Sequence, residues 1–148
     1  MATTASSSAG HAIQLHDLEL TQLQSVKQQL EEELSHFTSS FAQLKKAQAT
    51  FTSCVVAAKA VVPKNEGKTV LIPLTASISL TSELSDVEKL LVDVGTGYYV
   101  EKSSEDAGKF FQSKIDYLRS HLEKLEETIN TKQSNLRAVV NVMQMKLA

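Results

Sequence analysis

The stretch from Thr69 to Lys102 decides the fold, and it reads TVLIPLTASISLTSELSDVEKLLVDVGTGYYVEK. Four short runs in it are rich in Val, Ile, Leu, Thr and Tyr, which suit a half-buried pleated surface. Turn-forming residues separate these runs, with Ser85-Asp86 before the third and Gly95-Thr96-Gly97 before the fourth. We therefore expect residues 69–102 to form two β-hairpins.

The predicted hairpins need partner strands. A two-stranded hairpin is at best marginally stable in water. Pro73 lacks a backbone N–H, so its strand should lie at an edge or carry a bulge. We expect the hairpins to pair with each other or with hairpins of other chains. The residues expected to carry this subunit assembly are Val70, Ile72, Ile78, Leu80, Leu91, Val92, Val94, Tyr98, Tyr99 and Val100.

A first long helix is predicted over residues 13–62. Apolar residues spaced mostly three or four apart predict the seam of a coiled coil, with Gln48 filling one position. Pro63 should end this helix, because the residue before a proline is disfavoured in the α region. The seam positions are Leu23, Val26, Leu30, Leu34, Phe37, Phe41, Leu44, Phe51 and Val55.

A second long helix is predicted over residues 103–148, beginning at a capping box formed by Ser103 and Asp106. Its seam alternates steps of four and three along Phe111, Ile115, Leu118, Leu122, Leu125, Ile129, Lys132, Leu136, Val139 and Met143. The predicted fold class is mainly α with a small β-region: a long antiparallel two-helix coiled coil joined by two central β-hairpins.

Lys132 is the one polar residue in the second seam. Its stem can lie buried while the ammonium reaches water. It can also fix the register of the pair, as single polar seam residues do. In an antiparallel pair its partner would be Glu32 or Glu33, and both interpretations can hold together.

Both predicted helix ends meet at the far tip of the pair and carry more apolar residues than one seam absorbs. Some of these residues must be ordinary seam packing, whereas flexible Met side chains suit promiscuous contacts. The tip residues are Leu15, Leu18, Leu20, Leu23, Val139, Val140, Met143, Met145 and Leu147.

Composition bounds the partners and the location. The formal charge of −2 over 148 residues gives no indication of the basic surface that binds nucleic acid. No apolar run approaches the roughly 20 residues of a membrane span, so we expect no membrane contact.

The single cysteine, Cys54, favours a reducing compartment. Residues 1–12 are small and polar without a secretory pattern, and we expect a disordered tail and a cytoplasmic protein, with a nuclear fraction left open.

No motif predicts catalysis, a metal or a cofactor. Gly95-Thr96-Gly97 precedes a strand, so a tight turn is favoured over a phosphate loop. The sequence gives no positional indication of a base for Cys54, which is expected to pack as a small apolar residue. No ligand cluster at zinc spacing accompanies the histidines, which are His11, His16, His36 and His121.

The central residues resemble the α class of prefoldin subunits. The matching segments are Leu71–Thr75, Asp86–Glu88 and Val92–Lys102. The resemblance implies a heterohexamer of this chain with one further α-class and four β-class prefoldin subunits. It also implies ATP-independent capture of unfolded actin and tubulin, without any cofactor, and their delivery to the cytosolic chaperonin.

In this interpretation the tip residues bind the client and the hairpin residues assemble the subunits. One alternative is a prefoldin-like scaffold or adaptor subunit of another assembly, including a nuclear one, which would share the fold. A second alternative is an enzyme with a coiled-coil arm, against which the lack of a catalytic-sized domain argues.

Overall fold

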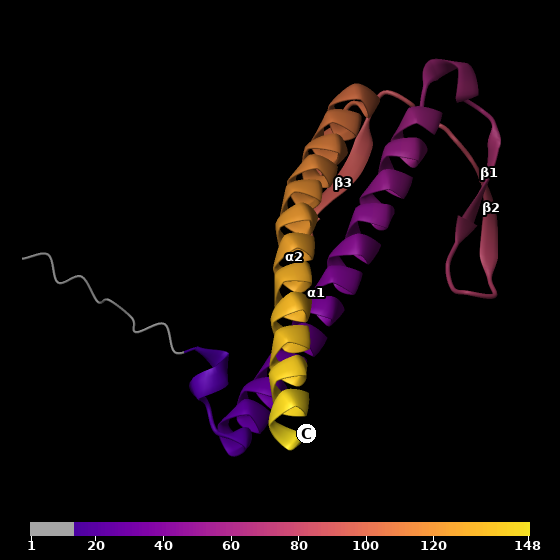
Figure 1. Cartoon of the computed structure of the whole chain (residues 1–148). Coiled ribbons are helices and arrows are strands. Elements are labelled where there is room, and N and C mark those ends of the chain that lie inside the picture. Colours follow the sequence, from indigo (N-terminus) through magenta and orange to yellow (C-terminus); the bar gives the residue numbers. More distant parts are fainter. Residues whose placement is uncertain (1–13) are drawn as a thin grey trace, which may run out of the picture. The chain divides into compact units, whose positions relative to one another are not determined.

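The computed structural model describes residues 14–148, so the predicted tail at residues 1–12 lies outside the described part (Figure 1). A 3-10 turn, η1, comes first. The elements then follow in the order η1 (Leu15–Asp17), α1 (Leu20–Ala60), η2 (Pro63–Asn65), β1 (Thr69–Pro73), β2 (Ser79–Glu83), β3 (Leu90–Gly95), β4 (Tyr98–Lys102) and α2 (Ser104–Leu147). Two long helices around two hairpins confirm the predicted fold class.

The described chain divides into two compact units. We call residues 14–39 and 125–148 the terminal unit, and residues 40–124 the central unit. Both long helices run through both units, and each unit is described by itself below.

The predicted seams are the buried faces of the helices. In the terminal unit, Leu23, Leu30 and Val139 are buried, and Lys132 is half-buried. In the central unit, the buried seam residues are Ile115, Leu118 and Leu122. The remaining seam positions of both helices are half-buried, which confirms the three-and-four spacing as the pattern of burial.

Helix α1 begins at Leu20, whereas the spacing predicted a helix from residue 13. Leu15–Asp17 form a 3-10 turn, and Leu18 after it has extended backbone (φ −76°, ψ 140°). The Glu19 N–H donates to Gln22 Oε1 at 3.0 Å, which is half of a capping box. The helix therefore starts at its own cap, and the leucines before it belong to a separate turn.

Helix α1 ends at Ala60, two residues before the predicted end. Val62 is extended (φ −135°, ψ 157°), as expected for the residue before Pro63. The Asn65 side-chain amide donates to the Ala60 carbonyl at 2.7 Å, and the Ser104 hydroxyl donates to the Ala58 carbonyl at 2.5 Å. These two bonds add side-chain donors to carbonyls of the last helical turn, and the Ala58 carbonyl also accepts from the Val61 N–H at 3.3 Å.

Strands β1 to β4 form two separate antiparallel hairpins, which do not pair with each other. In the first hairpin, Pro73 pairs with Ser79 next to the turn, at an edge as expected. In the second hairpin the register shifts between Asp93 and Gly95, which is a β-bulge. Positive φ at Gly95 (126°), Thr96 (44°) and Gly97 (81°) confirms the predicted tight turn.

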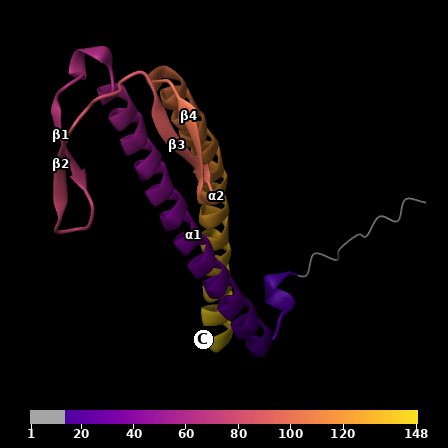
Figure 2. The same cartoon turned by 180° about the vertical axis from the view of Figure 1, so that it is seen from behind.

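The second hairpin packs on the helices of the central unit, along α2 (Figure 2). Val92 of β3 is buried in a cluster with Ala58 of α1 and Ala107 of α2. Phe110 and Phe111 pack against this cluster, with their ring centroids 5.4 Å apart. Small alanines on both helices make room for the strand, so this hairpin is anchored by its Val92 face.

The start of α2 gives a stability prediction. The Asp106 N–H donates to Ser103 Oγ at 3.1 Å, so Ser103 is the N-cap. Replacing an N-cap serine by alanine costs about 1 kcal/mol. Ser103→Ala should lower the free energy of unfolding by about that amount, measured by urea denaturation. Ser120→Ala, at an exposed position inside α2, is the control and should not destabilise; equal losses would contradict the cap.

Candidate interaction surfaces

The hairpins carry a large set of exposed apolar side chains, which we call the hairpin surface. Their exposed fractions run from 42% to 72%. A folded chain rarely leaves so many large apolar residues in water unless a partner covers them. The hairpin surface consists of Leu71, Ile72, Leu74, Ile78, Leu80, Leu91, Val94, Tyr98, Tyr99 and Val100.

The two hairpins differ in chemistry. The first has no charged residue from Thr69 to Ser82, and Ile72 lies opposite Leu80 in its register. The second sets Asp93 opposite Tyr99 and Leu91 opposite Glu101. A partner of the first hairpin therefore meets an uncharged aliphatic surface, whereas a partner of the second meets aromatic and charged groups together.

The structure refines the predicted assembly set. Of its ten residues, eight are exposed and belong to the hairpin surface, and Val70 is half-buried. Val92 is 3% exposed and packs inside its own chain, so it is not free for a partner. Leu71 and Leu74 are also exposed, although the sequence analysis did not include them among the assembly residues.

The terminal unit holds a second apolar group, the terminal cluster, formed by Leu23, Leu30, Val139 and Val142. Leu23 is 0% and Val139 is 1% exposed, so these two predicted tip residues are core side chains in the folded unit. Val142 was missed by the sequence analysis, although it lies three residues after Val139 on the same apolar face.

The other predicted tip residues lie around the terminal cluster. Met145 is 61% and Leu147 is 69% exposed, so both are open to a partner. The remaining five are half-buried: Leu15, Leu18, Leu20, Val140 and Met143. Of these, Leu15, Leu18 and Met143 pack against the cluster. The structure thus brings the two ends of the described chain together in one apolar group with an exposed rim.

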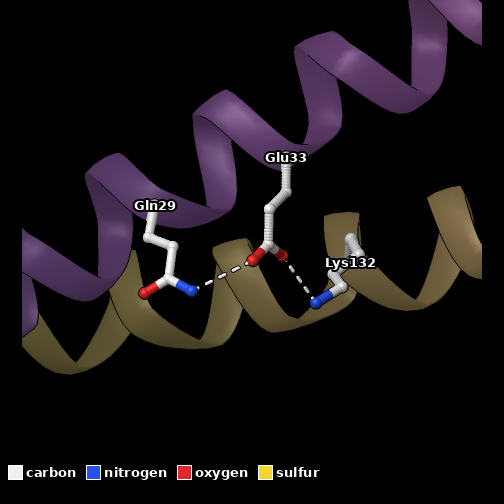
Figure 3. A network of polar contacts seen from close by, with 3 residues as sticks. All are labelled: Gln29, Glu33 and Lys132. Carbon is white, nitrogen blue, oxygen red and sulfur yellow. Dashed lines mark hydrogen bonds and ion pairs between the residues drawn. The ribbon is translucent and has the colours of Figure 1, made fainter.

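A polar network crosses the seam of the terminal unit (Figure 3). Lys132 Nζ lies 2.6 Å from Glu33 Oε2, and Gln29 Nε2 donates to Glu33 Oε1 at 3.0 Å. Glu33 is therefore the partner of Lys132, as one of the two predicted choices. The hydrogen bond from Lys132, followed by that from Gln29, lowers the pKa of Glu33 below its ordinary value.

The central unit contains a groove of about 710 Å³ between α1, β3 and the start of α2. Lys102 and Lys114 each place their Nζ 5.5 Å from the centroid of the Phe110 ring, and Phe110 and Lys114 line the groove. Cys54 also lines it and is half-buried. Other lining residues are Phe51, Ala57, Val61, Leu91, Val94 and Tyr99. Because several of these belong to the hairpin surface, the groove extends that surface onto the helices.

The residues singled out in the sequence for metal binding do not gather in the described part of the structure. Residues 14–148 contain no group of three or more His, Cys, Asp or Glu residues that could hold a metal ion. His16, His36 and His121 are exposed, and His11 lies outside the described residues. No helix in this part of the chain is long and apolar enough to cross a bilayer.

The Glu33 network gives a prediction on pH. A carboxylate whose pKa is lowered by folding stabilises the fold above its unfolded pKa of about 4.3, and this contribution is lost as the pH falls through the lower folded pKa. Glu33→Gln should therefore lower the melting temperature at pH 7, and the difference from the unmodified protein should shrink below about pH 4. Glu32→Gln, at the exposed neighbour, is the control. A difference that stays constant with pH would contradict the ion pair's role.

Comparisons with known proteins agree on one family. The Prefoldin family profile, described as prefoldin subunit, matches residues 30–148. Prefoldin subunit 5 of Homo sapiens is 40% identical over 136 residues, which cover 92% of this chain and 88% of that protein. Probable prefoldin subunit 5 of Schizosaccharomyces pombe is 44% identical, covering 91% and 89%. Prefoldin subunit 5 of Arabidopsis thaliana is 31% identical, covering 90% and 89%.

A solved structure was matched as well. The cryo-EM structure of filamentous PFD from Methanocaldococcus jannaschii is 22% identical, covers 87% of this chain and 98% of its own, and gives a TM-score of 0.46. The family is assigned from the sequence matches alone, because each match with a relative covers most of this chain and most of the relative. The chain therefore belongs to the prefoldin family of chaperone subunits, in which it is similar to the proteins named subunit 5.

Proposed function

We propose that this chain is one subunit of a heterohexameric, ATP-independent co-chaperone in the cytoplasm. It captures unfolded proteins such as actin and tubulin with its helix ends and delivers them to the cytosolic chaperonin. The observation that carries this proposal is the hairpin surface, with ten large apolar side chains exposed on two hairpins. A surface of this kind needs partner subunits, and membership of the prefoldin family says which kind of subunit they are.

Assembly follows from what each hairpin lacks. Both are isolated two-stranded sheets, so every strand has one edge with unpaired backbone groups. Free edges and exposed apolar faces together favour pairing with strands of other chains. The proposed partners are one further α-class and four β-class prefoldin subunits, whose hairpins would cover these edges.

Client holding follows from the rim of the terminal cluster. Met145 and Leu147 are open to solvent beside the buried cluster. Burying such a side chain contributes about 1.5–3 kcal/mol, so two of them stay well below the about 8 kcal/mol of micromolar binding. One subunit would therefore hold a client weakly, and several subunits acting together would supply avidity while each contact still releases quickly.

Assembly is tested by placing a charge on the hairpin surface. Leu91→Asp and Leu80→Asp should prevent hexamer formation with the other prefoldin subunits, because a carboxylate would be buried without a partner. The measurement is native mass spectrometry, with circular dichroism to show that the helices persist. Val56→Asp is the matched control, since the exposed fraction of Val56 (65%) lies between those of Leu80 (52%) and Leu91 (71%) and Val56 is on α1, outside the hairpins. Normal hexamers from both hairpin variants would contradict the assembly role.

Client capture is tested at the exposed rim. In a reconstituted hexamer, Met145→Ser with Leu147→Ser should reduce suppression of actin aggregation, measured by light scattering, and leave the hexamer intact. These substitutions spare Val139 and Val142, whose removal would unpack the terminal cluster. Gln144→Ser with Lys146→Ser is the control on neighbouring exposed positions. A hexamer that assembles normally but never suppresses aggregation would favour the scaffold or adaptor function instead.

A further inference from the structure

We propose that the segment Gln14–Leu18, which we call the strap, is an internal occupant of the client-binding surface and that an unfolded client displaces it. This inference rests on the proposed capture of clients by the terminal unit. It adds what covers that surface in the free protein and what kind of segment binds there. Figure 1 shows the strap in indigo, ahead of α1.

The strap contacts the terminal cluster through two leucines. Leu15 and Leu18 are half-buried and pack against the group formed by Leu23, Leu30, Val139 and Val142. His16 and Asp17 between them are exposed. One turn of backbone therefore presents two branched aliphatic side chains, three residues apart, to an aliphatic surface. The leucines cover residues that a client would otherwise reach.

The strap is weakly held. Its 3-10 turn spans three residues and has no side-chain cap, and it is closed by a backbone bond of 2.9 Å from the Asp17 N–H to the Gln14 carbonyl. Helix α1 has its own cap at Glu19, where the backbone N–H donates to Gln22. The strap can therefore lift at Leu18 and Glu19 without unwinding α1. Short, poorly hydrogen-bonded turns of this kind open at low free-energy cost.

The surface beneath the strap indicates the chemistry of its ligand. It is aliphatic, with the flexible Met143 beside it, and none of the described residues places a buried charge there. Met145 and Leu147 extend it outward as exposed side chains. The fitting client segment is thus a short stretch of unfolded chain with two branched aliphatic residues three positions apart and polar residues between them, as in Leu-His-Asp-Leu of the strap itself.

Competition with the strap sets the apparent affinity. A client can occupy the surface beneath the strap only while the strap is lifted, so the apparent dissociation constant for that surface exceeds the intrinsic one by the inverse of the lifted fraction. Loosening the strap should therefore strengthen client binding. This sign separates a cover from the client contact that the sequence analysis expected of Leu15 and Leu18, because a leucine that itself touched the client would weaken binding when removed.

The test compares two pairs of substitutions in the reconstituted hexamer. Leu15→Ser with Leu18→Ser should lower the dissociation constant for a fluorescently labelled, reduced and carboxymethylated unfolded protein roughly three- to tenfold, as expected if the strap is lifted for about a tenth to a third of the time. His16→Ser with Asp17→Ser, at the exposed strap positions, should leave it unchanged. In the unmodified hexamer, the Asp17 amide should exchange its hydrogen faster when the labelled protein is bound.

The remaining outcomes overturn the inference in distinguishable ways. Weaker binding by the leucine variant would show that Leu15 and Leu18 touch the client and do not cover its site. Equal binding by the leucine variant and the unmodified hexamer would show that the strap does not compete. Both results leave client capture intact. No binding by any hexamer, including the unmodified one, would overturn the proposed function together with the strap. Circular dichroism and native mass spectrometry show whether each variant folds and assembles.

Discussion

Each hairpin leaves the backbone groups of its outer edges unpaired, and the proposed assembly depends on this constraint. Each is a two-stranded sheet whose outer edges have unpaired backbone groups. The first hairpin also exposes Leu71, Leu74 and Ile78 on a segment without charge. Such a surface is an aggregation hazard in a lone chain and an interface in a complex. Such edges and exposed side chains favour pairing with partner strands, which fits a subunit of the prefoldin family.

The second hairpin shows how one strand serves two surfaces. Along β3, Val92 packs between Ala58 and Ala107, whereas Leu91 beside it is exposed. Alternation along a strand makes this division possible, because neighbouring side chains point to opposite faces. One face anchors the hairpin to the helices of the central unit, and the other stays available. The bulge and three positive φ angles at the following turn then set where the hairpin reverses.

The sequence predicted the helices better than it predicted what lies at their ends. The seam was readable residue by residue because burial repeats with the helical period, and even the Glu33–Lys132 pair was one of two choices. The start of α1 could not be predicted in this way. Leu15 and Leu18 continue the apolar pattern of the helix, whereas the hydrogen bond from the Glu19 N–H to Gln22 Oε1 caps the helix after them. Val92 was assigned to assembly because strand propensity does not say which face the helices cover.

The terminal unit combines strong packing with a weak rim, and this combination suits transient binding. Leu23 and Val139 are fully buried and pack in one cluster, which keeps the ends of the two helices together. Contacts beyond that core come from side chains that are half-buried or exposed, such as Met143 and Met145. If the buried core had to open for each client, the free energy needed to expose it would weaken client binding. In the proposed client capture only the strap has to lift while the terminal cluster stays packed, and contacts with the methionine rim stay weak enough for the client to be released.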